Sequence, residues 1–200
     1  MSVGGGIHGR MMTTVELSLA ILALLLTPGP TNTLMLLAGA ERGLTGAARL
    51  IPAELAGYLL TVTPLALAGQ SVLAAHPDLR LIMALVAAAW VTLLAVRLWQ
   101  RPSGAAPAPV GARALFMTTA LNPKALIFGL VLLPSPDRLP EHLALFAGLV
   151  CGVALVWAGL GAGLRKRTLH QPRALWLLRR LASVCLGGMA ALLVLRGLTA

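Results

Sequence analysis

Six long apolar stretches follow one another along this 200-residue chain, and they limit its possible folds more than any other feature. They run over about 17–40, 47–68, 79–99, 114–133, 143–164 and 175–198. Each is close to the ~20 residues that a helix needs to cross a bilayer. Only helices and closed barrels satisfy their backbone groups in lipid, and these runs lack the alternation of barrel strands. We therefore predict an all-α integral membrane fold with about six transmembrane helices.

The composition points to a lipid environment. Apolar residues make up 58% of the chain and charged residues only 11%, against about 25% in soluble proteins. The net charge of +10 does not indicate a nucleic-acid partner, because the basic residues flank apolar stretches and aromatic residues are only 4%. Cys151 and Cys185 lie inside apolar stretches without metal or redox spacing, which favours simple packing.

The chain divides into a tail and one transmembrane domain. Residues 1–13 are predicted to be a disordered tail, in which Met11 or Met12 could replace Met1 as the start. Residues 14–200 form the domain, with a Pro-, Ala- and Gly-rich linker at 101–113 between a first repeat (14–100) and a second (114–200). Three spans per half make the two three-helix repeats inverted. A cleaved signal peptide is disfavoured, because hydrophobicity resumes at Leu34 and no Ala-x-Ala site follows.

The basic residues predict an orientation. One side of the six spans carries Arg10, Arg80, Arg138 and Arg196, and the other carries Arg42, Arg49, Arg97, Arg101, Arg113, Arg165, Lys166, Arg167, Arg173, Arg179 and Arg180. The richer side should be cytoplasmic, which places both termini outside. If the fourth stretch is re-entrant instead of spanning, the termini lie on opposite faces.

Prolines interrupt the first helix of each half at matching positions. Thr27-Pro28-Gly29-Pro30 breaks the first stretch, and Asn122-Pro123-Lys124 breaks the fourth. Paired interruptions of this kind point to the binding site of a transporter, although prolines also kink packed membrane helices. Each proline frees the carbonyl four residues earlier, here those of Leu24, Leu26 and Thr119.

The two breaks would suit a ligand that carries both a negative and a positive charge. Free N–H groups past each break, near 31–33 and 124–126, attract a carboxylate, and freed carbonyls accept from an ammonium. Thr27, Thr31 and Asn32 add polar groups beside the first break, and Asn122 could cap the second half-helix. Amino acids would fit this pair of breaks.

Two charges are predicted within the membrane. Lys124 is a functional candidate by default, because a charge at that depth is costly. Glu54 could pair with Lys124 or with Arg49, or could carry a coupled proton. Gly148-x-x-x-Gly152, and Gly39-x-x-x-Gly43 more weakly, suit close helix contacts.

Two motifs resemble those of a known family, the LysE/RhtB amino-acid exporters, over about residues 14–200. The first is Thr27-Pro28-Gly29-Pro30 with Arg42-Gly43 and Gly46, and the second is Phe116, Leu121-Asn122-Pro123-Lys124-Ala125, Phe128 and Pro134. The resemblance implies proton-driven efflux of amino acids or their derivatives from a bacterial inner membrane. It also implies Pro28, Gly29, Pro30, Asn122, Pro123 and Lys124 as site residues.

The chain departs from that family in its second stretch. Pro52 replaces a usual helix glycine, and Gly57-Tyr58 stands where an acidic residue is expected, with Glu54 about one turn earlier. A cationic substrate should need intramembrane acids, so a neutral amino acid or derivative is the favoured substrate.

Other classes of function have weaker support. A membrane enzyme would need paired acids or a histidine cluster, whereas His8, His76, His142 and His170 lie in tails or at span ends without metal-like spacing. We therefore expect no catalytic residue, metal or cofactor. A non-transporting membrane scaffold is the other alternative, and a homo-oligomer is possible.

Overall fold

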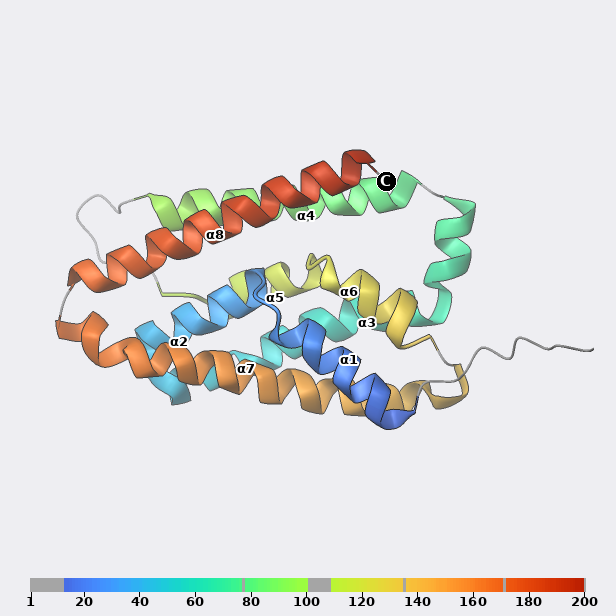
Figure 1. Ribbon diagram of the computed structural model, residues 1–200, viewed down its shortest axis with the longest axis horizontal. Helices are drawn as coiled ribbons and strands as arrows, with labels where there is room; N and C mark the ends of the chain where they lie inside the picture. The colour runs from blue at the N-terminus through green and yellow to red at the C-terminus, as the bar shows by residue number, and fades with distance from the viewer. Residues whose placement is uncertain (1–12, 77, 101–108, 135, 171, 200) are drawn as a thin grey trace, which may run out of the picture.

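The computed structural model describes residues 13–76, 78–100, 109–134, 136–170 and 172–199, and the regular elements in those ranges are all helices (Figure 1). They are α1 (Thr14–Leu26), α2 (Pro30–Ala48), α3 (Ile51–Ala75), α4 (Asp78–Trp99), α5 (Ala112–Ala120), α6 (Lys124–Ile127), the π-helix η1 (Phe128–Leu132), the 3₁₀-helix η2 (Pro136–Arg138), α7 (Leu139–His170) and α8 (Pro172–Thr199). The predicted all-α fold is confirmed over this part. Residues 1–12 of the predicted tail and 101–108 of the predicted linker lie outside it.

Three of the described helices are long and apolar enough to cross a membrane, over Ile51–Gly69, Leu81–Trp99 and Leu139–Arg165. Two bent helix pairs also pass this test, and they raise the number to five if each pair is one span. The last predicted span, about 175–198, lies in α8 and is not in that count. The structure therefore agrees with an all-α membrane protein of three to five candidate spans.

The two predicted breaks are confirmed as bends between helices. The pair α1 and α2 is bent by 64°, and the pair of Ala112–Ala120 with Lys124–Leu132 is bent by 51°. Pro30 occupies the first position of α2, where the backbone N–H that proline lacks would have no partner within the helix anyway. A second interruption occurs at Gly43, whose φ of 75° kinks α2 in a conformation that glycine adopts without strain.

Helices of the first half pack against helices of the second half. Helix α2 packs along α7, and α3 packs along α5 and η1. The remaining helices, α4 and α8, lie side by side and run in opposite directions, as the green and red ribbons show in Figure 1.

Small residues set the closest of these contacts. A Cβ atom at Gly39 would overlap the carbonyl of Ala158, and one at Gly161 would overlap the carbonyl of Leu36, so only glycine lets α2 and α7 approach this closely. Gly148 and Gly152 make no close helix contact within the described part of the chain, because a Cβ atom at either position would meet open space.

The apolar core consists of two clusters that meet at the breaks. Along the first bent pair, Leu25 belongs to one cluster and Leu34 to the other. Along the second bent pair the order is reversed, since Leu115 packs in the cluster of Leu34 and Ala125 in that of Leu25. The polar residues of both breaks therefore lie between two apolar regions.

A ring cluster stabilises one of these regions. Tyr58 meets Phe128 and Phe146 edge to face, at centroid distances of 5.8 and 5.5 Å. Phe128 and Phe146 lie 4.9 Å apart, so α3, η1 and α7 are packed against each other next to the second break.

Candidate functional site

The two breaks face each other across the interior. Lys124, the first residue of α6, donates its side-chain ammonium to the backbone carbonyl of Thr27 at the end of α1. Gly29 lies beside this contact, and a Cβ there would come within 3.0 Å of the lysine Nζ. A side chain at position 29 would therefore displace the ammonium. The structure brings together three of the predicted site residues from opposite halves of the chain.

The first break is closed by a side chain from its own second helix. The amide of Asn32 donates to the carbonyl of Leu25 at 2.7 Å and to that of Thr27 at 2.9 Å. The prolines predicted free carbonyls at Leu24 and Leu26. The two carbonyls that Asn32 bonds each lie one residue further along the chain. Because a carbonyl left unpaired in an apolar interior is costly, Asn32 stabilises the break itself.

The second break is organised by Asn122. Its carbonyl oxygen accepts from the backbone N–H of Lys124 at 3.0 Å, so the predicted cap is confirmed. Its amide donates to the hydroxyl of Thr31 at 3.0 Å and to that of Tyr58 at 3.2 Å. The hydroxyls of Thr31 and Thr119 lie 3.4 Å apart. Asn122 therefore ties the second break to α2 and α3.

Glu54 lies in the first turn of α3 and is only 2% exposed. Its Oε2 atom has no hydrogen-bond partner. Neither of the two partners considered for Glu54 forms an ion pair with it among the described residues: Arg49 is exposed, and the Lys124 ammonium bonds the Thr27 carbonyl. The two opposite charges still attract each other through the interior. A buried carboxylate with an unused oxygen remains near the breaks.

A hollow of about 320 Å³ opens at the meeting point of the breaks. Its lining consists of Thr27, Pro28, Gly29, Pro30, Asn122, Pro123, Lys124, Met189 and Leu192. Seven of these nine residues belong to the two predicted breaks. Thr31 and Asn32 are buried behind the turn, where they support it. Met189 and Leu192 come from α8, and nothing in an apolar helix marks them beforehand.

Two polar groups of the site were missed by the sequence analysis. Tyr58 was noted only as a departure from a family pattern, yet its hydroxyl joins the Asn122 network. Thr119 is fully buried and also donates to the carbonyl of Leu115. The signal available was a hydroxyl in the middle of an apolar stretch, one helical turn from a break or from Glu54.

This arrangement can hold a small zwitterion. The Lys124 ammonium can donate to a ligand carboxylate in place of the Thr27 carbonyl, and that carbonyl can then accept from a ligand ammonium. Within the described ranges, no group of three or more His, Cys, Asp or Glu side chains is placed to hold a metal ion.

The chain matches no family model, no curated protein and no solved structure. Over the described residues, fold and site define a class: an all-helical protein with three to five candidate membrane-spanning helices, whose two proline-broken helices meet at a lysine.

Proposed function

We propose that the protein is a secondary transporter that exports amino acids or their derivatives from the cytoplasm of a bacterium. The single observation that carries this proposal is the contact of Lys124 with the Thr27 carbonyl, which joins two broken helices around a hollow of about 320 Å³. Broken helices that meet in this way are the usual construction of a transporter site.

The proposal includes two inverted repeats of three spans. The packing supports this arrangement. The broken helix of each half packs against the middle helix of the other, α2 on α7 and α5 with η1 on α3. The last helices of the halves, α4 and α8, pack against each other. A two-fold relation between the halves would produce all three of these pairings.

A neutral substrate fits the buried charges better than a basic one. Two glutamates have buried side chains in the described interior. Glu41 is bound by Arg179, which leaves Glu54. A zwitterion needs one cation and one or two acceptors, and Lys124 with the Thr27 carbonyl supplies them. A second substrate cation would have no partner of its own.

The proposed cycle uses Glu54 as the proton carrier. Glu54 takes a proton from outside and releases it to the cytoplasm, while the two halves rock about Pro28–Pro30 and Pro123. When Lys124 binds the substrate carboxylate, it leaves the Thr27 carbonyl. The bond at the break therefore opens only when a carboxylate replaces it.

Efflux assays test this function. Bacteria lacking their own amino-acid exporters are loaded with amino acids through dipeptides, and loss is followed with and without a protonophore. The expected result is faster loss of one or a few neutral amino acids, abolished by the protonophore. The Pro123→Ala, Lys124→Ala double variant should lose this efflux, and Arg138→Ala, at an exposed ion pair, is the matched control.

Two outcomes would overturn the proposal. One is full efflux by the inserted double variant. The other is unchanged loss of every amino acid with the wild-type protein in the membrane, which would favour a scaffold or another metabolite.

A further inference from the structure

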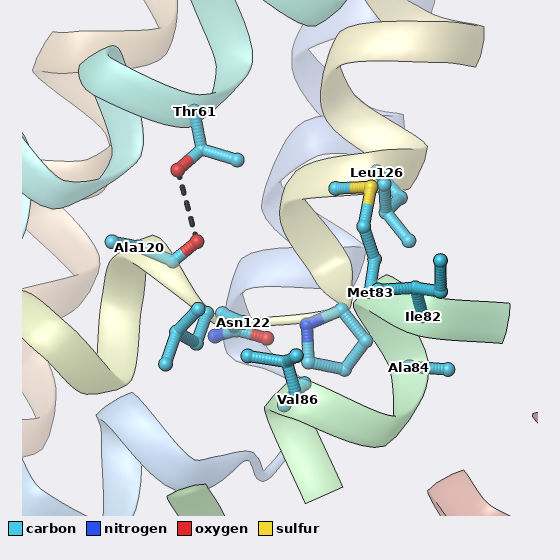
Figure 2. Close-up of a pocket in the computed structure, with 11 residues that line it drawn as sticks. Thr61, Ile82, Met83, Ala84, Val86, Ala120, Asn122 and Leu126 are labelled. Carbon is cyan, nitrogen blue, oxygen red and sulfur yellow. Dashed lines mark hydrogen bonds between the residues drawn. The ribbon is translucent and has the colours of Figure 1, made fainter. Parts of the chain in front are cut away.

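A second hollow lies beside α4, next to the second break (Figure 2). Its volume is about 160 Å³. Its walls come from α3, α4 and the α5–α6 segment, and they consist of Thr61, Ile82, Met83, Ala84, Val86, Ala87, Ala120, Leu121, Asn122, Pro123 and Leu126. Two of these residues, Asn122 and Pro123, also line the hollow at Lys124.

The lining of this hollow offers an occupant no free side-chain hydrogen-bond donor. Of its two polar side chains, Thr61 donates its hydroxyl proton to the carbonyl of Ala120 at 2.9 Å, as the dashed line in Figure 2 shows. Asn122 has both its amide donors and its oxygen in use within the site. Because neither group has a donor to spare, the hollow favours an uncharged apolar occupant.

The two hollows are lined by residues of two neighbouring helices, α4 and α8. Met189 and Leu192 of α8 line the hollow at Lys124, whereas Ile82 and Val86 of α4 line the second one. Because α4 and α8 pack along each other, the helices that line the two hollows are neighbours. The Asn122–Pro123 segment is common to both linings.

We propose that the hollow beside α4 holds the side chain of the substrate while the substrate carboxylate lies at Lys124. This inference rests on the proposed export function and adds its specificity. An apolar cavity of about 150 Å³ takes up a benzene ring, so 160 Å³ matches the side chain of leucine, methionine or phenylalanine. The substrate class is then an amino acid with a large, uncharged, apolar side chain.

Two residues of α4 should determine specificity. Ala87 is 3% exposed and lies in the wall, so Ala87→Leu fills the hollow. Met83→Ala enlarges it. A changed side-chain volume in an apolar pocket alters selectivity by roughly 10–200-fold per methylene. Leu85 lies on α4 outside the lining and is 42% exposed, which makes Leu85→Ala the matched control.

The experiment measures efflux of alanine, serine, leucine, phenylalanine and tryptophan for each variant as ratios within one membrane preparation. Ala87→Leu should lower the leucine-to-alanine ratio at least about tenfold. Met83→Ala should raise the ratio of tryptophan or phenylalanine to leucine, and Leu85→Ala should leave all ratios unchanged. Ratios cancel differences in the amount of folded protein, and Met83→Ala decides the question if Ala87→Leu does not insert.

The contrary results separate the two proposals. Wild-type export of serine in preference to leucine, or equal change of all substrates in both variants, would overturn the apolar subsite and leave amino-acid export standing. Export of no amino acid by the wild-type protein would overturn the proposed function itself.

Discussion

Arg179 of α8 forms a buried ion pair with Glu41 of α2, with an N–O distance of 2.5 Å. The arginine Nε also lies 3.0 Å from the same carboxylate oxygen, and the second oxygen accepts from the backbone N–H of Val110 at 2.9 Å. The next residue, Arg180, stacks over the ring of Trp99 at 3.6 Å. Two consecutive arginines thus attach α8 to α2 and to α4.

Breaking this ion pair from one side should destabilise the protein strongly. Arg179→Ala leaves the Glu41 carboxylate buried and without its cation, at a cost of roughly 3–5 kcal/mol. Thermal unfolding in detergent should show a large decrease in Tm. Arg138→Ala, at an ion pair whose side chains are 49% and 70% exposed, should cost no more than about 1 kcal/mol. Equal effects of the two substitutions would contradict the buried pairing.

A methyl group at Gly161 should separate α2 from α7. Gly161→Ala places a Cβ against the carbonyl of Leu36, which is backbone and cannot move aside easily. We expect lower thermal stability and loss of folded protein. Gly148→Ala, on the same helix in open space, should be tolerated, since it also removes a flexible residue from a helix. If Gly161→Ala and Gly148→Ala have the same Tm, α2 and α7 do not approach each other as closely as described.

Glu54→Gln should separate proton coupling from substrate binding. The amide keeps the size of the buried side chain but cannot carry a proton between states. We expect loss of net uphill efflux with retention of substrate exchange, measured as counterflow of labelled amino acid in vesicles. Glu16→Gln, at an exposed residue, is the control. Uphill efflux by Glu54→Gln at the wild-type rate would assign the coupling elsewhere.

The positions of the two termini should distinguish five spans from six. Six spans place both termini outside, whereas a re-entrant pair α5 and α6 places them on opposite faces. Alkaline phosphatase and a fluorescent protein fused to each end report the outer and the cytoplasmic face, respectively. We expect phosphatase activity at both ends, and fluorescence at one end would show an odd number of spans.

Much of the secondary structure follows from local sequence. Apolar stretches of about 20 residues form long helices, and prolines end or bend them, so both breaks were predictable from Pro28, Pro30 and Pro123. The cap by Asn122 was predictable for the same reason, because a freed N–H beside an asparagine has an obvious partner.

The partners of the charged groups were decided by tertiary structure. Glu54 and Lys124 are the natural pair from sequence, yet the lysine bonds the carbonyl of Thr27, which the first proline break leaves available. Glu41 follows the first apolar stretch, and Arg179, 138 positions later, binds its side chain in the interior. Sequence separation carries no information on such pairs, since the crossing of two helices brings them together.

Sequence by itself determined that this chain forms apolar helices with two polar interruptions, because hydrophobicity and proline geometry act over a few residues. Only the tertiary structure decided that the interruptions meet, that Asn32 and Asn122 satisfy them, and that α4 and α8 cover two hollows beside them. Those relations depend on helix packing, in which glycines such as Gly39 and Gly161 set the distance between backbones.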